Sequence, residues 1–180
     1  MPQMLLKDIT LAFTNCMTRE SEYGGWSYSF IIDENDFCDK VRACLATQKS
    51  KQWNDEENTN SNIIKRANLK RKDDVTHEPT RDIMKDTDLL VTVKSKTAAI
   101  TNTEGCSLAR GTTADVLIDP FEFVYNKKKM ICIRSHADRG CTVKVNKLVE
   151  FTGGTQYFEV KNAAEQAFDA QALAEVNVPF

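Results

Sequence analysis

The chain has 180 residues, of which 41% are hydrophobic and 28% are charged, and its formal net charge is -2. These values exclude a chain that is disordered throughout, and no stretch reaches the ~18 uninterrupted apolar residues of a transmembrane helix. The start of the sequence has no basic region followed by a long apolar run, so we expect no signal peptide, no membrane association and a cytoplasmic protein.

Six cysteines make an even count, but without an export signal we expect reduced thiols that mostly fill the core. They are Cys16, Cys38, Cys44, Cys106, Cys132 and Cys141. Cys132, His136 and Cys141 lie close in sequence but lack a fourth ligand at a zinc-knuckle spacing. We therefore predict no metal site and no other cofactor.

The first half of the chain predicts two strands and a helix. Residues 4–13 alternate loosely, and residues 26–32 alternate with a clear period of two, as strands do. Apolar residues then recur at helical spacing, which predicts a helix from near Asp36 to near Lys51.

A polar segment over residues 54–87 follows the helix. Because such a long connection does not fit inside a compact barrel, we predict an insertion on the outside of the body or a functional arm. A short helix around residues 63–69 is compatible with its few apolar positions.

From residue 89 the pattern changes to strands. The predicted strands are residues 89–93, 112–118, 121–125, 130–134 and 142–151, with a turn at 126–129. Five to seven strands with one clear helix, and no alternation of strand and helix, predict a mainly β fold: an antiparallel β barrel with an inserted helix. We place one domain at residues 1–154 and a flexible acidic tail at residues 155–180.

The charge is distributed unevenly along the chain. Residues 127–147 contain seven basic side chains and one acidic one, whereas residues 150–180 contain five acidic side chains and one basic one. A further basic cluster lies at residues 65–72. The near-neutral total therefore conceals a basic late body and an acidic tail.

Basic strands interleaved with aromatic residues are typical of proteins that bind single-stranded nucleic acid, because cations follow the phosphates and rings stack on bases. The predicted basic residues are Lys94, Lys96, Arg110, Lys127, Lys128, Lys129, Arg134 and Lys144. The predicted stacking residues are Trp26, Tyr28 and Tyr125. The alternative for Trp26, Phe30, Phe121 and Phe123 is that they fill the core, and we favour it for any single one of these rings because buried rings outnumber stacking rings.

The chain ends with an aromatic ring beside a free carboxylate. A partner with an apolar pocket rimmed by Arg or Lys can bind both groups, so Glu175, Pro179 and Phe180 form a predicted partner-binding tail. Three alternatives remain: the acidic tail lies over the basic surface, the terminus is frayed, or residues 163–173 form a helix that docks on the body.

Three segments together resemble the single-stranded-DNA-binding proteins of the short-tailed-phage replication type. They are residues 24–32 followed by the helix from Asp36, residues 111–125, and residues 141–151 before an acidic tail that ends in phenylalanine. The resemblance implies an OB-fold, binding of single-stranded DNA without sequence preference, and a viral protein of the host cytoplasm. It also implies a tail that recruits replication proteins such as a polymerase or a helicase-primase, and it is compatible with a homo-oligomer.

The tip Val178-Pro179-Phe180 is also similar to the Ile-Pro-Phe tip of bacterial single-stranded-DNA-binding proteins. Both relatives place several acidic residues next to the tip, whereas only Glu175 lies within the last ten residues here. This difference concerns recruitment through the tail more than it concerns DNA binding.

No set of residues has the arrangement of a catalytic site. The two histidines, His77 and His136, lie in polar segments without a matching nucleophile, and we expect Asp115 and Asp119 to be solvent-facing strand residues rather than metal ligands. We therefore predict a protein that is not an enzyme and that coats and protects single-stranded DNA during DNA replication, recombination or repair. Two alternatives remain open: a protein-interaction or virion-structural module that uses the acidic tail, and an RNA-binding OB module.

Overall fold

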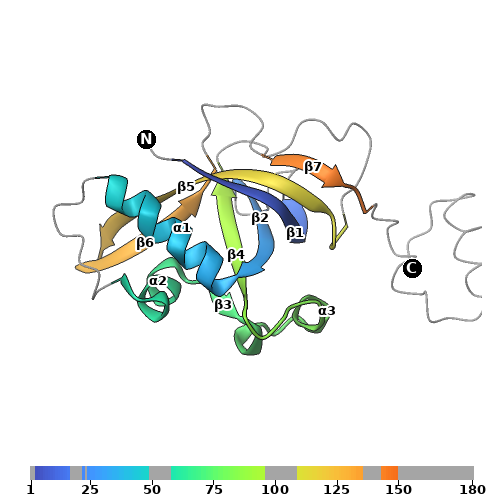
Figure 1. The fold of residues 1–180 in the computed structure, drawn as a ribbon, viewed down its shortest axis with the longest axis horizontal. Coiled ribbons are helices and arrows are strands. Elements are labelled where there is room, and N and C mark those ends of the chain that lie inside the picture. The colour runs from blue at the N-terminus through green and yellow to red at the C-terminus, as the bar shows by residue number, and fades with distance from the viewer. Residues whose placement is uncertain are drawn as a thin grey trace, which may run out of the picture.

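The structure is a computed structural model that describes residues 3–16, 22, 24–48, 58–95, 109–135 and 143–149. Its strands are β1 (Met4–Cys16), β2 (Trp26–Asp33), β3 (Lys70–Arg71), β4 (Asp88–Ser95), β5 (Thr113–Tyr125), β6 (Lys128–Arg134) and β7 (Val143–Lys147). Its helices are α1 (Glu34–Thr47), α2 (Asn60–Ala67), the 3-10 helix η2 (Lys72–Asp74) and α3 (Glu78–Asp82) (Figure 1).

Five strands close into a barrel. They pair in the order β1–β2–β4–β6–β5, and β5 pairs in turn with β1, which completes the ring. Every pairing is antiparallel except that of β4 with β6, which is parallel and has one register pair, Lys94 with Arg134. β7 extends the sheet along β5. A closed five-stranded barrel of this kind is the architecture of the OB-fold, so the predicted fold class is confirmed.

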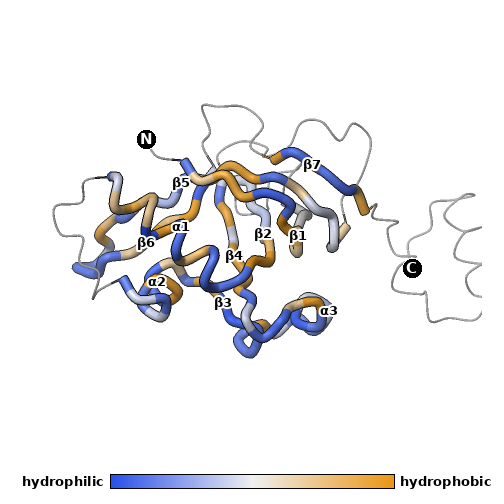
Figure 2. The backbone as a smooth tube through the Cα atoms, viewed as in Figure 1, coloured by the Kyte–Doolittle hydropathy of each residue, from blue (hydrophilic) through white to orange (hydrophobic). Residues whose placement is uncertain are grey.

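Alternation along the strands builds the core inside the ring. Phe30 of β2, Val91 of β4 and Val116 of β5 are fully buried and belong to one hydrophobic cluster. The helix α1, which lies across the barrel in Figure 1, adds Phe37 and Leu45 to the same cluster. Figure 2 shows the result as hydrophobic strand centres beside a hydrophilic tip of the β5–β6 hairpin.

The helix α1 begins directly after its N-cap residue, Asp33. The Asp33 side chain accepts a hydrogen bond from the Asp36 backbone N–H at 3.1 Å, which satisfies one of the free N–H groups of the first turn. The predicted helix is therefore found, two residues earlier at its start and about one turn shorter at its end.

Beside α1, the Arg71 guanidinium holds the pKa of the Glu34 carboxyl below its usual value.

The predicted strands 112–118 and 121–125 form one continuous strand, β5. Its first half, to Ile118, pairs with β1, and its second half, from Asp119, pairs with β6. The hydrophobic alternation is interrupted at Asp119 and Pro120 because the strand changes partner there. The interruption in the sequence therefore marks a change of partner rather than a loop.

The described part of the predicted insertion is an outer layer that packs on the barrel. Ile63 of α2 is fully buried in the main core, so this segment is less solvated than its polar composition indicates. Val75 and Met84 form a second, smaller cluster with Ile31 and Leu90 on the outer face of β2 and β4. The predicted short helix is found as α2, a few residues earlier than expected.

Cys38, Cys44 and Cys132 are free thiols, as expected for reduced cysteines. Burial raises the pKa of the Cys38 thiol to about 11. None of the helices described here has the length and apolar character that crossing a membrane requires. Other predictions fall outside the described residues: Lys96, Cys106, His136, Cys141 and the whole tail, with Glu175, Pro179 and Phe180.

Candidate nucleic-acid interface

A groove of about 470 Å³ opens on the outer face of the barrel, where β4 and β6 diverge. Near Arg134 the two strands are paired, but further along, Leu90 of β4 pairs with Lys70 of β3 instead of with β6. The C-terminal end of α2 forms one wall of this opening, which we call the β4–β6 groove. Its basic lining residues are Arg66, Lys70 and Lys94.

The groove extends over β4 toward β1. Phe13, Ser29 and Thr92 are register partners across β1, β2 and β4, and both Phe13 and Thr92 line the groove. Ser29 and Thr92 share a hydrogen bond between their hydroxyl oxygens at 2.8 Å. The ring of Phe13 meets His77 edge-on, with ring centroids 5.4 Å apart. Ser29 is buried, whereas Thr92 is exposed and lines the groove, and the Phe13 ring lies beside it.

The β5–β6 hairpin supplies the other end of the groove. Phe121, Phe123 and Tyr125 alternate along β5, so they share one face of the hairpin. Phe123 is 38% exposed and lines the groove, and Tyr125 is 63% exposed. The rings of Phe121 and Phe123 lie 5.8 Å apart. This face is a stripe of aromatic side chains with increasing exposure toward the tip.

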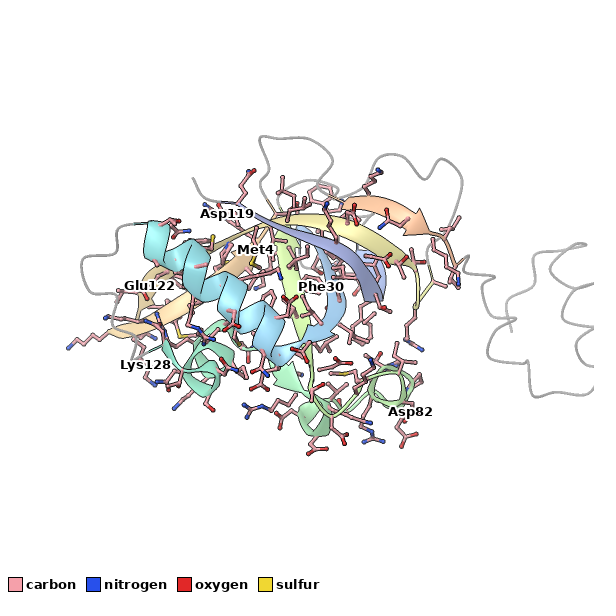
Figure 3. The ribbon with its side chains drawn as sticks, viewed as in Figure 1. Met4, Phe30, Asp82, Asp119, Glu122 and Lys128 are labelled. Atoms are coloured by element: carbon pink, nitrogen blue, oxygen red, sulfur yellow. The ribbon has the colours of Figure 1, made fainter. Side chains whose placement is uncertain are left out.

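The hairpin ends in a tight basic turn. Asn126 and Lys127 both have positive φ, 48° and 63°, which is typical of the two-residue turns that match the twist of paired strands. Lys127 and Lys128 are exposed, and Lys128 lies at the outer end of the hairpin in Figure 3. The turn therefore presents cations beside the aromatic stripe.

Arg134 is held between β5 and β6. Its Nε and Nη2 both donate to Oδ2 of Asp119, at 3.3 and 3.2 Å, and the Asp119 side chain is fully buried. The guanidinium carbon lies 4.1 Å from the centroid of the Phe121 ring, a cation–π contact. The direction of this guanidinium is therefore fixed by a carboxylate and by a ring.

Most of the predicted basic residues that the structure describes gather on this side of the barrel. Lys94, Lys127, Lys128, Lys129, Arg134 and the predicted stacking residue Tyr125 lie on the groove or on the hairpin beside it. Trp26 is half-buried at the start of β2, where it is the register partner of Ser95, the residue after Lys94.

Arg110 and Lys144 lie elsewhere. The turn that contains Arg110 is hydrogen-bonded to Leu11 and Val149, and Lys144 of β7 is the register partner of Asp115. In Figure 1, β7 and the β5–β6 hairpin lie on opposite sides of the barrel. The structure therefore does not bring these two cations to the groove.

The prediction of Tyr28 as a stacking residue is wrong. Its side chain is 1% exposed and its ring lies 6.5 Å from that of Phe30 inside the barrel. The same alternation that makes β2 a clear strand in the sequence turns Tyr28 inward, where no base can reach it.

Several residues of the groove are not predicted by the sequence. Phe121 and Phe123 are expected in the core, although the alternation places them on one face with Tyr125. Arg66 and Lys70 belong to the basic cluster of the predicted external insertion, and the structure brings them to the groove. Phe13 has no signal, because nothing in a single strand shows which face stays uncovered.

The acidic residues of β5 have partners of their own. Asp115 accepts hydrogen bonds from the Asn146 side chain at 2.7 Å and from the Asp8 backbone at 2.8 Å, and these bonds lower the pKa of its carboxyl. Asp119 is buried against Arg134, which corrects the expectation that it faces solvent. In the described ranges, no three His, Cys, Asp or Glu side chains form a group that could hold a metal ion.

Comparison with known proteins finds a likeness in structure. No protein-family model and no curated protein sequence matches the chain. Among solved structures, the single-stranded DNA-binding protein from bacteriophage Enc34 matches with a TM-score of 0.52 at 11% identity, over 93% of this chain and 90% of that one. The chain has the fold of a phage single-stranded-DNA-binding protein. The predicted resemblance to such proteins is thereby confirmed at the level of the fold.

Two further structures of the Enc34 single-stranded DNA-binding protein agree. Its C-terminal truncation matches with a TM-score of 0.53 at 12% identity, over 84% of this chain and 88% of that one. Its complex with ssDNA matches with a TM-score of 0.51 at 12% identity, over 84% of this chain and 90% of that one.

The β4–β6 groove lies on the surface that OB-folds generally use. Oligonucleotides and oligosaccharides bind OB-folds on the face of the second and third barrel strands and on the loops that join strands one and two, and four and five. In this chain the second and third barrel strands are β2 and β4, and the turn at Asn126 and Lys127 joins the fourth to the fifth. The cations and rings described above therefore coincide with the expected binding face of the fold.

Proposed function

We propose that this protein binds single-stranded DNA without sequence preference along the β4–β6 groove, and coats and protects it during phage DNA replication, recombination or repair. One observation supports the proposal above all: a groove with Lys70 and Lys94 along it, and Phe13 and Phe123 at its ends, lies on the ligand face of an OB barrel. The structural match to a phage protein solved in complex with ssDNA points the same way.

Two physical terms contribute to this binding. Exposed cations displace counterions from the phosphates. For single strands, the logarithm of the binding constant then falls by about 0.7 per phosphate contact for each tenfold increase in salt concentration. Stacking of bases on rings contributes about 1–3 kcal/mol per base and does not depend on the base. Arg66 differs from the lysines because its guanidinium is paired with Glu122, so it supplies shape more than charge.

The proposal extends to the tail and to assembly. Glu175, Pro179 and Phe180 would recruit replication proteins such as a polymerase or a helicase-primase, and several copies could associate along one DNA strand. No membrane enters this scheme, and no catalytic step is required of the protein.

The test is a titration of the protein with poly(dT) at about 50 and 200 mM salt. Binding is measured by the quenching of tryptophan fluorescence, and a gel shift is run on the same samples. We expect a stoichiometric endpoint whose affinity falls with salt, and no comparable signal with duplex DNA. A matched RNA oligonucleotide in the same assay separates DNA binding from RNA binding. Silence in both assays would overturn the proposal and favour the protein-interaction module.

A further inference from the structure

A buried carboxylate lies beside a surface that we propose binds a polyanion. Asp119 is 0% exposed, and its register partner across the hairpin is Arg134. A negative charge at this place weakens the attraction of the surface for DNA phosphates. If the surface binds DNA, we therefore expect Asp119 to contribute to binding in another way.

The geometry shows what Asp119 does to Arg134. Both Nε and Nη2 donate to the same carboxylate oxygen, so one edge of the guanidinium is occupied. The guanidinium carbon of Arg134 lies over the ring of Phe121, whose ring neighbours that of Phe123 at the groove. The Arg134 side chain is still 35% exposed. The guanidinium is thus a fixed, flat and partly exposed group with its charge opposed by a carboxylate.

We propose that Asp119 is a positioning residue that holds the Arg134 guanidinium against Phe121, so that Arg134 acts as a stacking surface for a base and not as a phosphate ligand. A guanidinium plane stacks on aromatic rings and on bases, and the opposing carboxylate reduces its attraction for phosphate. This inference rests on the proposed function, because it assigns a role within the same interface.

The decisive variant is Asp119→Asn, compared with Asp82→Asn. Each substitution removes one negative charge, but Asp82 is an exposed residue of α3, a different element from the hairpin (Figure 3). If charge alone mattered, both variants would bind single-stranded DNA as tightly as the wild type or more tightly. Positioning predicts the opposite sign for Asp119→Asn: an affinity for a dT oligonucleotide weaker by about five- to tenfold, with no fall in the salt slope.

A second set of variants tests whether Asp119 acts through Arg134. We expect Asp119→Asn to weaken binding in the wild-type background but to change nothing in an Arg134→Met background. Phe121→Leu keeps an apolar side chain and removes the ring, so it should reproduce the loss even if Arg134→Met does not fold. Thermal unfolding of each variant shows that binding is compared between folded proteins.

The outcomes separate the two proposals. If the wild type binds and folded Asp119→Asn binds equally well or better, the positioning role is wrong while the proposed function stands. Losses that multiply in the double variant also exclude a role through Arg134. If the wild type itself does not bind single-stranded DNA, the proposed function fails first.

Discussion

Single side chains on the hairpin show how alternation along one strand produces a surface. Tyr125 and Phe123 follow each other on the same face of β5, and both remain exposed although they are large and aromatic. Scattered exposed apolar residues are ordinary, but a row of rings beside lysines is not. Under the proposed function, this row of rings would contribute the part of the affinity that does not depend on salt.

Tyr125→Ala tests that contribution. Because the side chain is 63% exposed, we expect the free energy of unfolding to change by less than about 0.5 kcal/mol. The affinity for a dT oligonucleotide should fall by about 1–2 kcal/mol, because a stacking ring is removed, while its salt dependence stays the same. Leu5→Ala is the matched control, since Leu5 is also large, apolar and half exposed but lies on β1. An equal loss for both variants would contradict the assignment.

Residues of this kind could be predicted only in part. Tyr28 and Tyr125 lie in strands with the same periodicity, yet one is in the core and the other on the surface. Periodicity groups the side chains of a strand into two faces but does not show which face the neighbouring strands enclose. That choice depends on pairings that are distant in sequence.

At the scale of elements, the β5–β6 hairpin combines a strained turn with a high density of charge. Lys127 occupies a conformation with positive φ that glycine adopts more readily, and two more lysines follow it. A turn selected for stability alone would favour Asn-Gly here. The lysine at this position is consistent with a contribution to binding that offsets a small cost in stability.

Replacing Lys127, Lys128 and Lys129 by Ala tests the charge of the turn. We expect weaker binding to every single-stranded sequence, and a salt slope reduced by about 0.7 for each phosphate that no longer has a cation beside it. The measurement is the dissociation constant at four or five salt concentrations. Lys144→Ala with Lys147→Ala on β7 is the control, and its slope should match the wild type. If the β7 variant lowers the slope and the hairpin variant does not, the DNA follows the other side of the barrel.

Helices and strands were predictable where their signals are local. The capping residue and the helical spacing located α1 within a few residues, and the turn residues located the hairpin. The continuity of β5 was not predictable, because Asp119 and Pro120 interrupt the pattern where the strand changes partner. The packing of α2 against β6 is not predictable either, because Ile63 and Ile64 are surrounded by polar residues in the sequence.

At the scale of the molecule, a barrel of antiparallel strands follows from the sequence, but the pairings that close it do not. Ring closure depends on the pairing of β1 with β5 and on the parallel contact of β4 with β6. Both join segments that are far apart in the sequence, and a parallel contact leaves no turn signal in the chain. The groove forms at this closure, so its place could not be predicted either.

The contact of β4 with β6 has a measurable consequence. In the described part of the chain it consists of the register pair of Lys94 with Arg134 and of a bond from the Ser135 N–H to the Lys94 carbonyl at 2.8 Å. We expect amide exchange in β6 and at Ser135 to slow when a dT oligonucleotide binds, because DNA in the groove bridges both strands. Exchange followed by mass spectrometry measures this, with β1–β2 peptides as the internal reference. Equal protection of all peptides would argue against binding at this site.

The small contact between β4 and β6 also has a consequence for the flexibility of the barrel. Among the described residues, four of the five strand pairings of the ring have several register pairs, whereas β4 and β6 have one. We therefore expect the ring to be most compliant between β4 and β6, where the proposed ligand lies. A bound strand of DNA would then contact both β4 and β6 and hold their edges together. The free protein would then be the more flexible of the two states, free and DNA-bound, and each molecule would become more rigid when it binds DNA.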